Sequence, residues 1–324
     1  MDNSSPILVT IYVLTYKKFS RLYSNLWSIV QQDYPCIELL VSDDGSENFP
    51  KDEIEAFLCK NCRNNIVMRQ VFANSQNVGT VKHINFLLSK AHGELFIPLS
   101  ADDEFYNNHI VSDIVAEYGR THFNVLSTSR VAVDVKGRKM FLYPHFLDRY
   151  LIKKYIQSSK QQFYRFMQGR FNNFASGSTM TIRTDFLRMI GGHDEKYVLW
   201  EDGPFIAKTT SLGYRINYRL DLVTIKYGIG GISTGGAHGH VLEILGKDGH
   251  QYMNDKSEYK KKIDDRSTLR FMEYDESYNE KTGFSRFIWR LKYADVFIQK
   301  QWYALYESIF MRYDKFYLHY HSLD

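Results

Sequence analysis

The sequence contains little cysteine, and this argues against two kinds of scaffold. Among its 324 residues there are three cysteines, Cys36, Cys59 and Cys62. An odd, low count argues against a disulfide framework and fits a reducing compartment. Cys59 and Cys62 form one CxxC pair, but a structural zinc site needs four ligands, and no second CxxC or paired histidine follows nearby. We therefore expect neither a disulfide scaffold nor a zinc domain.

Long apolar runs are absent as well. No window approaches about 18 uncharged apolar residues, so we expect no transmembrane helix. Residues 1–6 are polar, and no charged segment precedes an apolar one, so we expect no signal peptide. These absences predict a cytoplasmic protein, or one bound peripherally to the cytosolic face of the inner membrane.

The sequence also lacks a large excess of positive or negative charge. Lys and Arg number 41 against 37 Asp and Glu, which gives a formal net charge of +4. This mild excess does not suit a nucleic-acid-binding protein, so we expect no nucleic-acid partner. Aromatic residues, in contrast, make up 15% of the chain. Sugar-binding sites, membrane interfaces and ordinary cores all use such rings.

The first hundred residues alternate between apolar runs and helical spacing. We predict buried strands at 7–16, 36–46, 66–73 and 94–100, and helices at 20–33, 51–61 and 80–93. Ser20 is the expected N-cap of the first helix, and Gly93 is expected to close the third. This alternation predicts an α/β fold with a mostly parallel central sheet flanked by helices.

The pattern is looser after residue 105. We predict a helix at 110–119, a strand at 124–137, a long helical stretch at 146–169, a glycine-rich loop after Gly228 and a helical tail from about residue 255. The predicted organisation is one α/β domain over 1–240, which divides at about residue 105. A helical C-terminal extension covers 241–324.

Two acidic clusters begin where predicted strands end. Asp43 and Asp44 lie in SDDGS, and Asp102 and Asp103 lie in SADD. Ligands bind outside the carboxyl ends of strands in open α/β sheets, so both clusters are expected to face one site. A carboxylate there can accept hydrogen bonds from a ribose or a base, and Mg²⁺ or Mn²⁺ needs only one or two carboxylates beside substrate phosphates. The alternative is a pair of turns and helix caps.

Two further segments have candidate chemistry. In NVG, at 77–79, a glycine allows close backbone approach, and the helix that follows carries Lys82. In WEDGPF, at 200–205, Glu201 and Asp202 open a predicted helix. They could present a general base, or they could simply complement the helix dipole.

These four segments, in this order, resemble the inverting glycosyltransferases of family 2, which have the GT-A fold. The resemblance covers roughly residues 5–220 and is carried by the stretches 13–46, 73–88, 95–105 and 176–205. It implies that residues 1–240 form a Rossmann-like GT-A catalytic domain, with a nucleotide-binding half at 1–105 and an acceptor half at 106–240. Such a domain uses a nucleotide-sugar, with Mn²⁺ or Mg²⁺ as cofactor. A single displacement would invert the anomeric carbon.

The resemblance also implies residue roles. Asp202, with Glu201 beside it, would be the catalytic base, and Asp102 and Asp103 would hold the metal and the ribose. His238, ahead of His240, would add a metal ligand or a diphosphate contact, and residues 176–178 would lie beside the sugar. The residues expected around the nucleotide are Thr15, Tyr16, Asp43 or Asp44, Asn77, Gly79, Lys82 and Asp102.

The sequence departs from the family at two points. Ser100 occupies a position that is often aspartate, and serine is a poor metal ligand, so the metal would depend on Asp102 and Asp103. No QxxRW-like segment follows Asp202, which favours transfer of a single sugar. The expected donor is a UDP-sugar, and the expected acceptor is a glycan or a polyprenyl-diphosphate-linked oligosaccharide of capsule or O-antigen type.

Three alternatives are weaker. A sugar nucleotidyltransferase predicts a glycine-rich loop after the first strand, and LTYKKFS has no glycine. An inactive relative that serves as a binding protein would be expected to lose Asp102, Asp103 or Asp202, and all three are present. A glycosidase also uses paired carboxylates, but it does not need this type of sheet edge.

Two segments, 146–169 and 284–320, mix aromatic with basic residues. This mixture suits a helix in a membrane interface, internal packing of a C-terminal segment, or a homodimer contact. We favour packing or a homodimer over membrane contact on the sequence alone.

Overall fold

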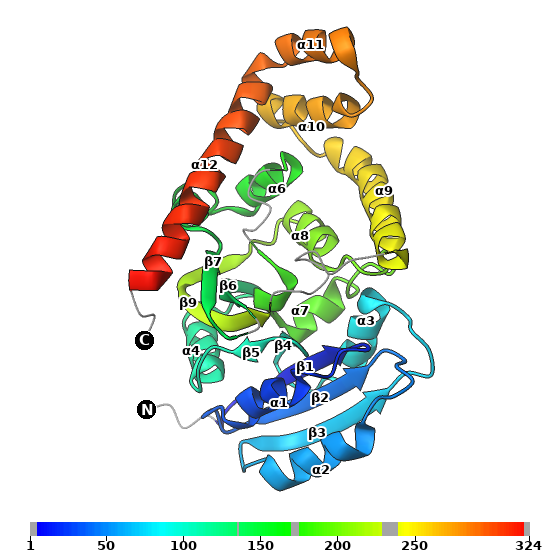
Figure 1. The fold of residues 1–324 in the computed structure, drawn as a ribbon, viewed down its shortest axis with the longest axis vertical. Coiled ribbons are helices and arrows are strands. Elements are labelled where there is room, and N and C mark those ends of the chain that lie inside the picture. Colours follow the sequence, from blue (N-terminus) through cyan, green and yellow to red (C-terminus); the bar gives the residue numbers. More distant parts are fainter. Residues whose placement is uncertain (1–4, 135, 170–174, 229–238, 321–324) are drawn as a thin grey trace.

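A computed structural model describes residues 5–134, 136–169, 175–228 and 239–320. Within these residues one nine-stranded sheet runs in the order β3-β2-β1-β4-β8-β6-β9-β5, with β7 paired to β6 (Figure 1). The first four strands pair in parallel. They are β1 (Val9–Thr15), β2 (Ile37–Asp43), β3 (Ile66–Ala73) and β4 (Leu95–Ser100).

The second half of the sheet mixes directions. β4 pairs antiparallel with β8, which pairs antiparallel with β6, and β6 pairs in parallel with β9. The strands are β5 (Glu104–Phe105), β6 (Val125–Val133), β7 (Lys139–Tyr143), β8 (Met180–Arg183) and β9 (Asn217–Gly228). The prediction of a mostly parallel central sheet with flanking helices is confirmed.

Helices cover both faces of the sheet, and the strand pattern explains why. Along β1, Ile11 and Val13 join one buried cluster with α1 (Leu22–Val30), whereas Tyr12 joins another with α3 (Thr80–Lys90). Successive side chains of a strand point to opposite faces, so an unbroken apolar run needs cover on both. The other helices of this region are α2 (Lys51–Asn61), α4 (Ile110–Thr121), α7 (Thr184–Met189) and α8 (Asp202–Ser211).

Two local predictions were wrong, and a third gained detail. Helix α1 begins after Arg21, so Ser20 is not its cap. Helix α3 ends at Lys90, and Gly93 instead packs so closely on β1 that a Cβ there would lie 2.3 Å from the Thr10 amide nitrogen. The stretch 146–169 is two helices, α5 (Phe146–Tyr155) and α6 (Ser159–Met167). Ser158 separates them because its side chain accepts a hydrogen bond from the backbone of Gln161 and caps α6.

A helical arm follows the sheet domain and arches over it (Figure 1). It consists of α9 (His240–Lys260), α10 (Arg266–Tyr278), α11 (Gly283–Lys292) and α12 (Ala294–Tyr320). One face of α12 returns to the sheet domain, where the Tyr303 hydroxyl donates to Asp148 at 2.9 Å. None of the helices in the described residues is long and apolar enough to cross a membrane.

Candidate active site

The carboxyl ends of β1, β2 and β4 meet at one edge of the sheet. The Asp44 N–H donates to the Thr15 carbonyl at 3.0 Å, and the Ala101 N–H donates to the Leu14 carbonyl at 3.1 Å. Parallel register places Thr15 opposite Asp43 and Leu14 opposite Ser100. The two acidic clusters therefore lie on one edge, as the sequence predicted.

Asp43 and Asp44 are both buried, and both shape the loops around them. Asp43 accepts hydrogen bonds from the backbone and the hydroxyl of Ser46, at 2.6 and 2.8 Å. Asp44 organises the loop that follows β3, since its carboxylate accepts from the Asn74 side chain and from the backbones of Val78 and Gly79. Both aspartates therefore stabilise turns. The Asp44 carboxylate accepts three hydrogen bonds, whereas the Asp43 carboxylate accepts two.

The NVG segment packs against the segment that carries the candidate base. Gly79 has a φ of +88°, and a Cβ there would lie 2.5 Å from Val198 Cγ1. The Val81 N–H donates to the Val198 carbonyl at 3.1 Å. Only glycine combines this backbone conformation with such close approach. The loop before α3 and the loop before α8 are therefore neighbours, although about 120 residues separate them.

The remaining predicted nucleotide residues surround this edge. Thr15 is buried, whereas the Tyr16 ring is 41% exposed with the Lys17 ammonium 4.9 Å from its centroid. Asn77 is exposed, and its amide donates to the Asp44 carbonyl. Lys82 is exposed on the first turn of α3. The side chains of Tyr16, Asn77 and Lys82 are therefore accessible to a ligand that lies along the strand ends.

Asp102 and Asp103 have different environments. Asp102 is partly exposed, and no donor contacts its carboxylate within the described part of the chain. Asp103 is 0% exposed, and its Oδ1 accepts from the Gly228 N–H at 3.1 Å. Burial, followed by the charge of Asp102, raises the pKa of Asp103 to about 8. Asp102 is therefore the carboxylate that the edge presents to a ligand.

Two arginines near this acidic pair were missed by the sequence analysis. Both guanidinium groups act electrostatically on Asp103 and oppose the rise in its pKa. Arg21 forms an ion pair with Glu104 at 3.1 Å. Arg130 lies between two tyrosine rings, with 4.1 Å to the Tyr227 centroid, and donates to Ser178 at 2.8 Å. Arg130 lies on β6, outside the four segments, and strand pairing brings it to the site. Arg21 lies within the stretch 13–46 as the N-cap residue of α1, where nothing in the local sequence marked it.

The Asp202 carboxylate is held from several directions. Its Oδ1 accepts from the Trp200 indole at 2.9 Å and from the Gly203 N–H at 2.7 Å. Its Oδ2 accepts from the Gly177 N–H at 3.1 Å, which joins it to residues 176–178. Because Ser178 also bonds to Arg130, a continuous set of contacts links Asp202 to the surroundings of Asp103.

Glu201 lies beside Asp202 in a different environment. Burial is the main cause of a raised pKa for Glu201, and the charges of Asp202 and Asp248 add to it. A Cβ on Gly177 would lie 2.3 Å from Glu201 Oε1, so the glycine leaves room for this side chain. Two adjacent carboxyl groups with different environments are suited to different roles.

Asp248 is a further residue that the sequence did not reveal. It lies on α9, is 2% exposed, and accepts hydrogen bonds from three consecutive backbone N–H groups. The donors are Val198 at 2.9 Å, Leu199 at 2.7 Å and Trp200 at 2.9 Å. The helical arm thereby holds the loop that carries the candidate base.

The predicted metal site is built from few protein ligands. His238 lies outside the described residues, and His240 begins α9, where its Nδ1 is 3.3 Å from Glu243. No group of three or more His, Cys, Asp or Glu side chains that could hold a metal occurs in the described ranges. Two features nevertheless fit a divalent cation: the open carboxylate of Asp102, and the buried Oδ2 of Asp103, which has no hydrogen-bond partner among these residues. Hard cations need only one or two carboxylates when a diphosphate supplies further oxygens.

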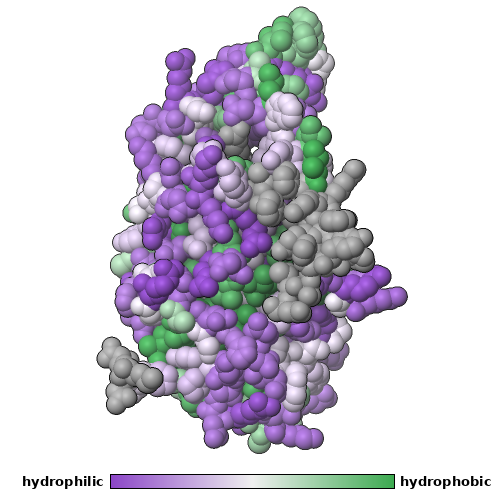
Figure 2. Space-filling view, turned by 90° about the vertical axis from the view of Figure 1, so that its left-hand side faces the viewer, coloured by the Kyte–Doolittle hydropathy of each residue, from purple (hydrophilic) through white to green (hydrophobic). Residues whose placement is uncertain are grey.

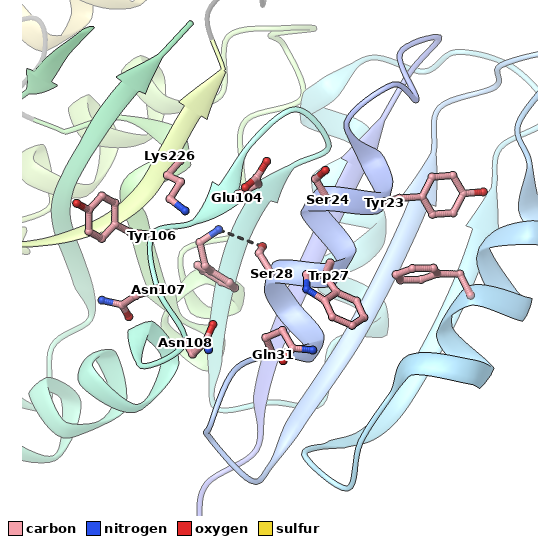
Figure 3. A pocket seen from close by; sticks show the side chains of 12 residues that line it. Tyr23, Ser24, Trp27, Ser28, Gln31, Glu104, Tyr106, Asn107, Asn108 and Lys226 are labelled. Atoms are coloured by element: carbon pink, nitrogen blue, oxygen red, sulfur yellow. Dashed lines mark hydrogen bonds between the residues drawn. The ribbon is translucent and has the colours of Figure 1, made fainter. Parts of the chain in front are cut away.

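A groove lies beside the site and contains none of the predicted site residues (Figure 3). Trp27 and Tyr23 of α1 line one side, and Tyr106 and Asn107 after β5 line the other. Glu104, the neighbour of Asp103, stands at its rim with Lys226. The groove runs away from the strand ends and along α1.

The family model of glycosyl transferase family 2 matches residues 10–191. This range is more than half of the chain and contains both acidic clusters at the sheet edge. The chain therefore belongs to glycosyl transferase family 2. Comparison with curated proteins gave no match.

Solved structures share the fold. Residues 1–349 of S. aureus TarS match with a TM-score of 0.59 at 18% identity, over 90% of this chain and 80% of that chain. A longer S. aureus TarS chain matches with a TM-score of 0.56 at 19% identity, over 82% of this chain and 42% of its own length. The mannosyltransferase PcManGT from Pyrobaculum calidifontis, in complex with GDP-Man and Mn²⁺, gives 0.51 at 17% identity over 68% of this chain and 57% of that chain. These likenesses establish the GT-A fold.

Proposed function

We propose that the chain is a metal-dependent, inverting glycosyltransferase that moves one sugar from a UDP-sugar to a hydroxyl group. The expected acceptor is a glycan or a lipid-linked oligosaccharide in surface polysaccharide synthesis. The observation that carries the proposal is the placement of Asp202, fixed by three N–H donors, beside the strand ends that carry Asp43 and Asp102. Structures of S. aureus TarS with UDP and with UDP-GlcNAc support the choice of donor.

Asp202 would act as the general base. Its fixed orientation leaves lone pairs for the proton of an acceptor hydroxyl. The acceptor oxygen bonds to the anomeric carbon while the sugar–phosphate bond breaks from the opposite face, and the diphosphate leaves with the electron pair. Glu201 would not compete for this role, because burial raises its pKa to about 8 and the carboxyl group therefore stays protonated at neutral pH.

The leaving group would lie over Asp102. This carboxylate would hold Mn²⁺ or Mg²⁺ with Asp103 behind it, and the bound ion neutralises charge that develops on the diphosphate. Arg21 and Arg130 add positive charge at the same place. The residues that would surround the nucleoside are Thr15, Tyr16, Asp43, Asn77, Gly79 and Lys82. Asp44 would contribute indirectly, because its hydrogen bonds hold the loop that contains Gly79.

Nucleotide binding is tested by calorimetric titration of the chain with UDP and GDP, with and without Mn²⁺. We expect UDP to bind more tightly than GDP, and we expect its affinity to fall at least tenfold in EDTA and in Asp102→Ala. The control is Asp113→Ala, an exposed aspartate on α4. Unchanged UDP binding in EDTA would contradict the metal site and leave the arginines and His238 to bind the diphosphate.

The base is tested separately with Asp202→Asn. We expect sugar transfer to fall about 10²–10⁴-fold, because general-base catalysis contributes that much. UDP affinity in the calorimeter should stay within about twofold of the unchanged chain, since Asp202 faces the acceptor. Asp185→Asn, an exposed aspartate on α7, should retain full transfer. A parallel loss of UDP affinity would show that Asp202 has a structural role instead.

A further inference from the structure

Helix α11 presents an apolar face that nothing in the described chain covers. Phe284, Phe287, Ile288 and Leu291 recur at helical spacing and are 77%, 55%, 47% and 58% exposed. No residue of this ten-residue helix is buried. We call these four side chains the α11 face. They gather at the upper end of the molecule, which Figure 2 shows as a hydrophobic patch above a largely hydrophilic surface.

Helix α12, which follows, also has exposed apolar side chains. Along α12, Ile298, Trp302, Leu305 and Ile309 are each at least 52% exposed and recur at helical spacing. The opposite face of α12 packs internally, since Val296 is buried and Tyr303 bonds to Asp148. The expectation of internal packing therefore holds for one face of α12, but it does not account for α11.

In the part of the chain that the structure describes, positive charge without an ion-pair partner lies at the two ends of α11, at Lys281 and Lys292, and on the side of α11 that faces Tyr278, at Arg286 and Arg290. Lys281, Arg286, Arg290 and Lys292 lie within or next to α11, and none of them has an ion-pair partner among the described residues. They lie instead against aromatic rings, with Arg286 over Tyr278 at 5.2 Å and Lys292 over Trp289 at 5.0 Å. Asp295 is the one carboxylate between Lys281 and Trp302, and it pairs with Arg270.

We propose that the α11 face docks on an anionic lipid surface. Apolar and aromatic side chains enter the boundary between headgroups and acyl chains, and the flanking cations contact acidic headgroups. A second copy of the chain fits less well, because a symmetric contact would bring two sets of unpaired cations together. An anionic membrane neutralises the same charges. The proposal does not depend on the transfer reaction, since α11 lies far along the arm from the strand ends (Figure 1).

The test is sedimentation of the full chain with vesicles of phosphatidylcholine, either alone or mixed with phosphatidylglycerol. We expect binding to the mixed vesicles that weakens as salt is raised. Phe287→Glu combined with Leu291→Glu should lower the partition coefficient at least tenfold, because two apolar side chains would no longer be withdrawn from water. Lys281→Gln combined with Lys292→Gln should reduce binding to the mixed vesicles only.

The matched control is Met189→Glu combined with Leu212→Glu, which adds the same charge at two exposed apolar residues outside the arm. It should bind vesicles nearly as well as the unchanged chain. Circular dichroism and UDP titration check that the α11 variant stays folded, as expected for a helix with no buried residue. Failure of the unchanged chain to bind mixed vesicles, or equal binding by the α11 and control variants, would overturn the proposal. The proposal would also be overturned if light scattering showed that the unchanged chain and the control variant are dimers while the α11 variant is a monomer.

Discussion

At the scale of single residues, two adjacent carboxyl groups lie in different surroundings. Asp202 accepts from three N–H groups, whereas burial and neighbouring charge raise the pKa of Glu201. The sequence identified the pair but left open which residue is the base. Hydrogen-bond donors that come from Gly177 and Trp200 favour Asp202, and one of these donors is supplied by a distant segment.

The raised pKa of Glu201 predicts a pH dependence of stability. The folded chain keeps this proton where the unfolded chain releases it, so the stabilising contribution is complete below about pH 4.5 and is lost as pH rises through the folded pKa. Glu201→Gln keeps the neutral form at every pH. We expect the variant to gain stability relative to the unchanged chain between pH 5 and pH 8, on the order of 1 kcal/mol.

Urea unfolding at several pH values would measure this gain. Glu280→Gln, at an exposed glutamate beyond α10, should show no such trend with pH. A constant difference between Glu201→Gln and the unchanged chain across the range would contradict a protonated Glu201.

At the scale of elements, the site consists of loops that follow buried strands. Apolar runs and their polar ends are local features, so the strands, helices and acidic clusters near the carboxyl ends could be predicted. Helix ends could not be predicted as well. Ser20 and Gly93 have the residue types of caps, but α1 and α3 end according to packing against the sheet. Ser158, which does cap α6, lies within the predicted helical stretch 146–169, and the prediction did not place a break there.

Gly79 offers a test of how the loops meet. We expect Gly79→Ala to destabilise the chain by about 1–3 kcal/mol, because its φ of +88° is strained for other residues and a Cβ would collide with Val198. Sugar transfer should fall as well, since the Val198 loop carries the candidate base.

Thermal unfolding and transfer assays would measure both effects. The control is Gly119→Ala on α4, where a Cβ would meet nothing within 4 Å. That change should be neutral or slightly stabilising. Normal stability in Gly79→Ala would mean that the two loops do not need their close contact.

At the scale of the whole molecule, the helical arm contributes to the site. Helix α9 brings Asp248 under the loop 198–200, although nothing in its sequence marks this residue as functional. The arm therefore links the candidate base to the helices that carry the α11 face. Membrane docking and catalysis would then involve the same helical arm.

Asp248→Asn tests this link. The substitution replaces one carboxylate oxygen with an amide NH₂ group, which cannot accept a hydrogen bond from the backbone of residues 198–200. Because at least one of these N–H groups would lose its acceptor, we expect the loop to shift. We expect kcat to fall about 10²-fold, since small displacements of a catalytic group have such effects, with little change in UDP affinity. Glu258→Gln, at an exposed residue of α9, should retain kcat. Unfolding of Asp248→Asn, or unchanged kcat, would remove Asp248 from the positioning of the base.

The sequence by itself determined the fold class, the succession of the early strands along the chain and the four segments at the sheet edge, because apolar periodicity and strand-end polarity are local patterns. Only the tertiary structure decided which side chains meet there. Asp103 became buried, and Arg130 and Asp248 reached the site from β6 and α9, because strand pairing and helix packing join residues far apart in the chain. The same packing covered one face of α12 and left the α11 face open, a difference that composition alone does not encode.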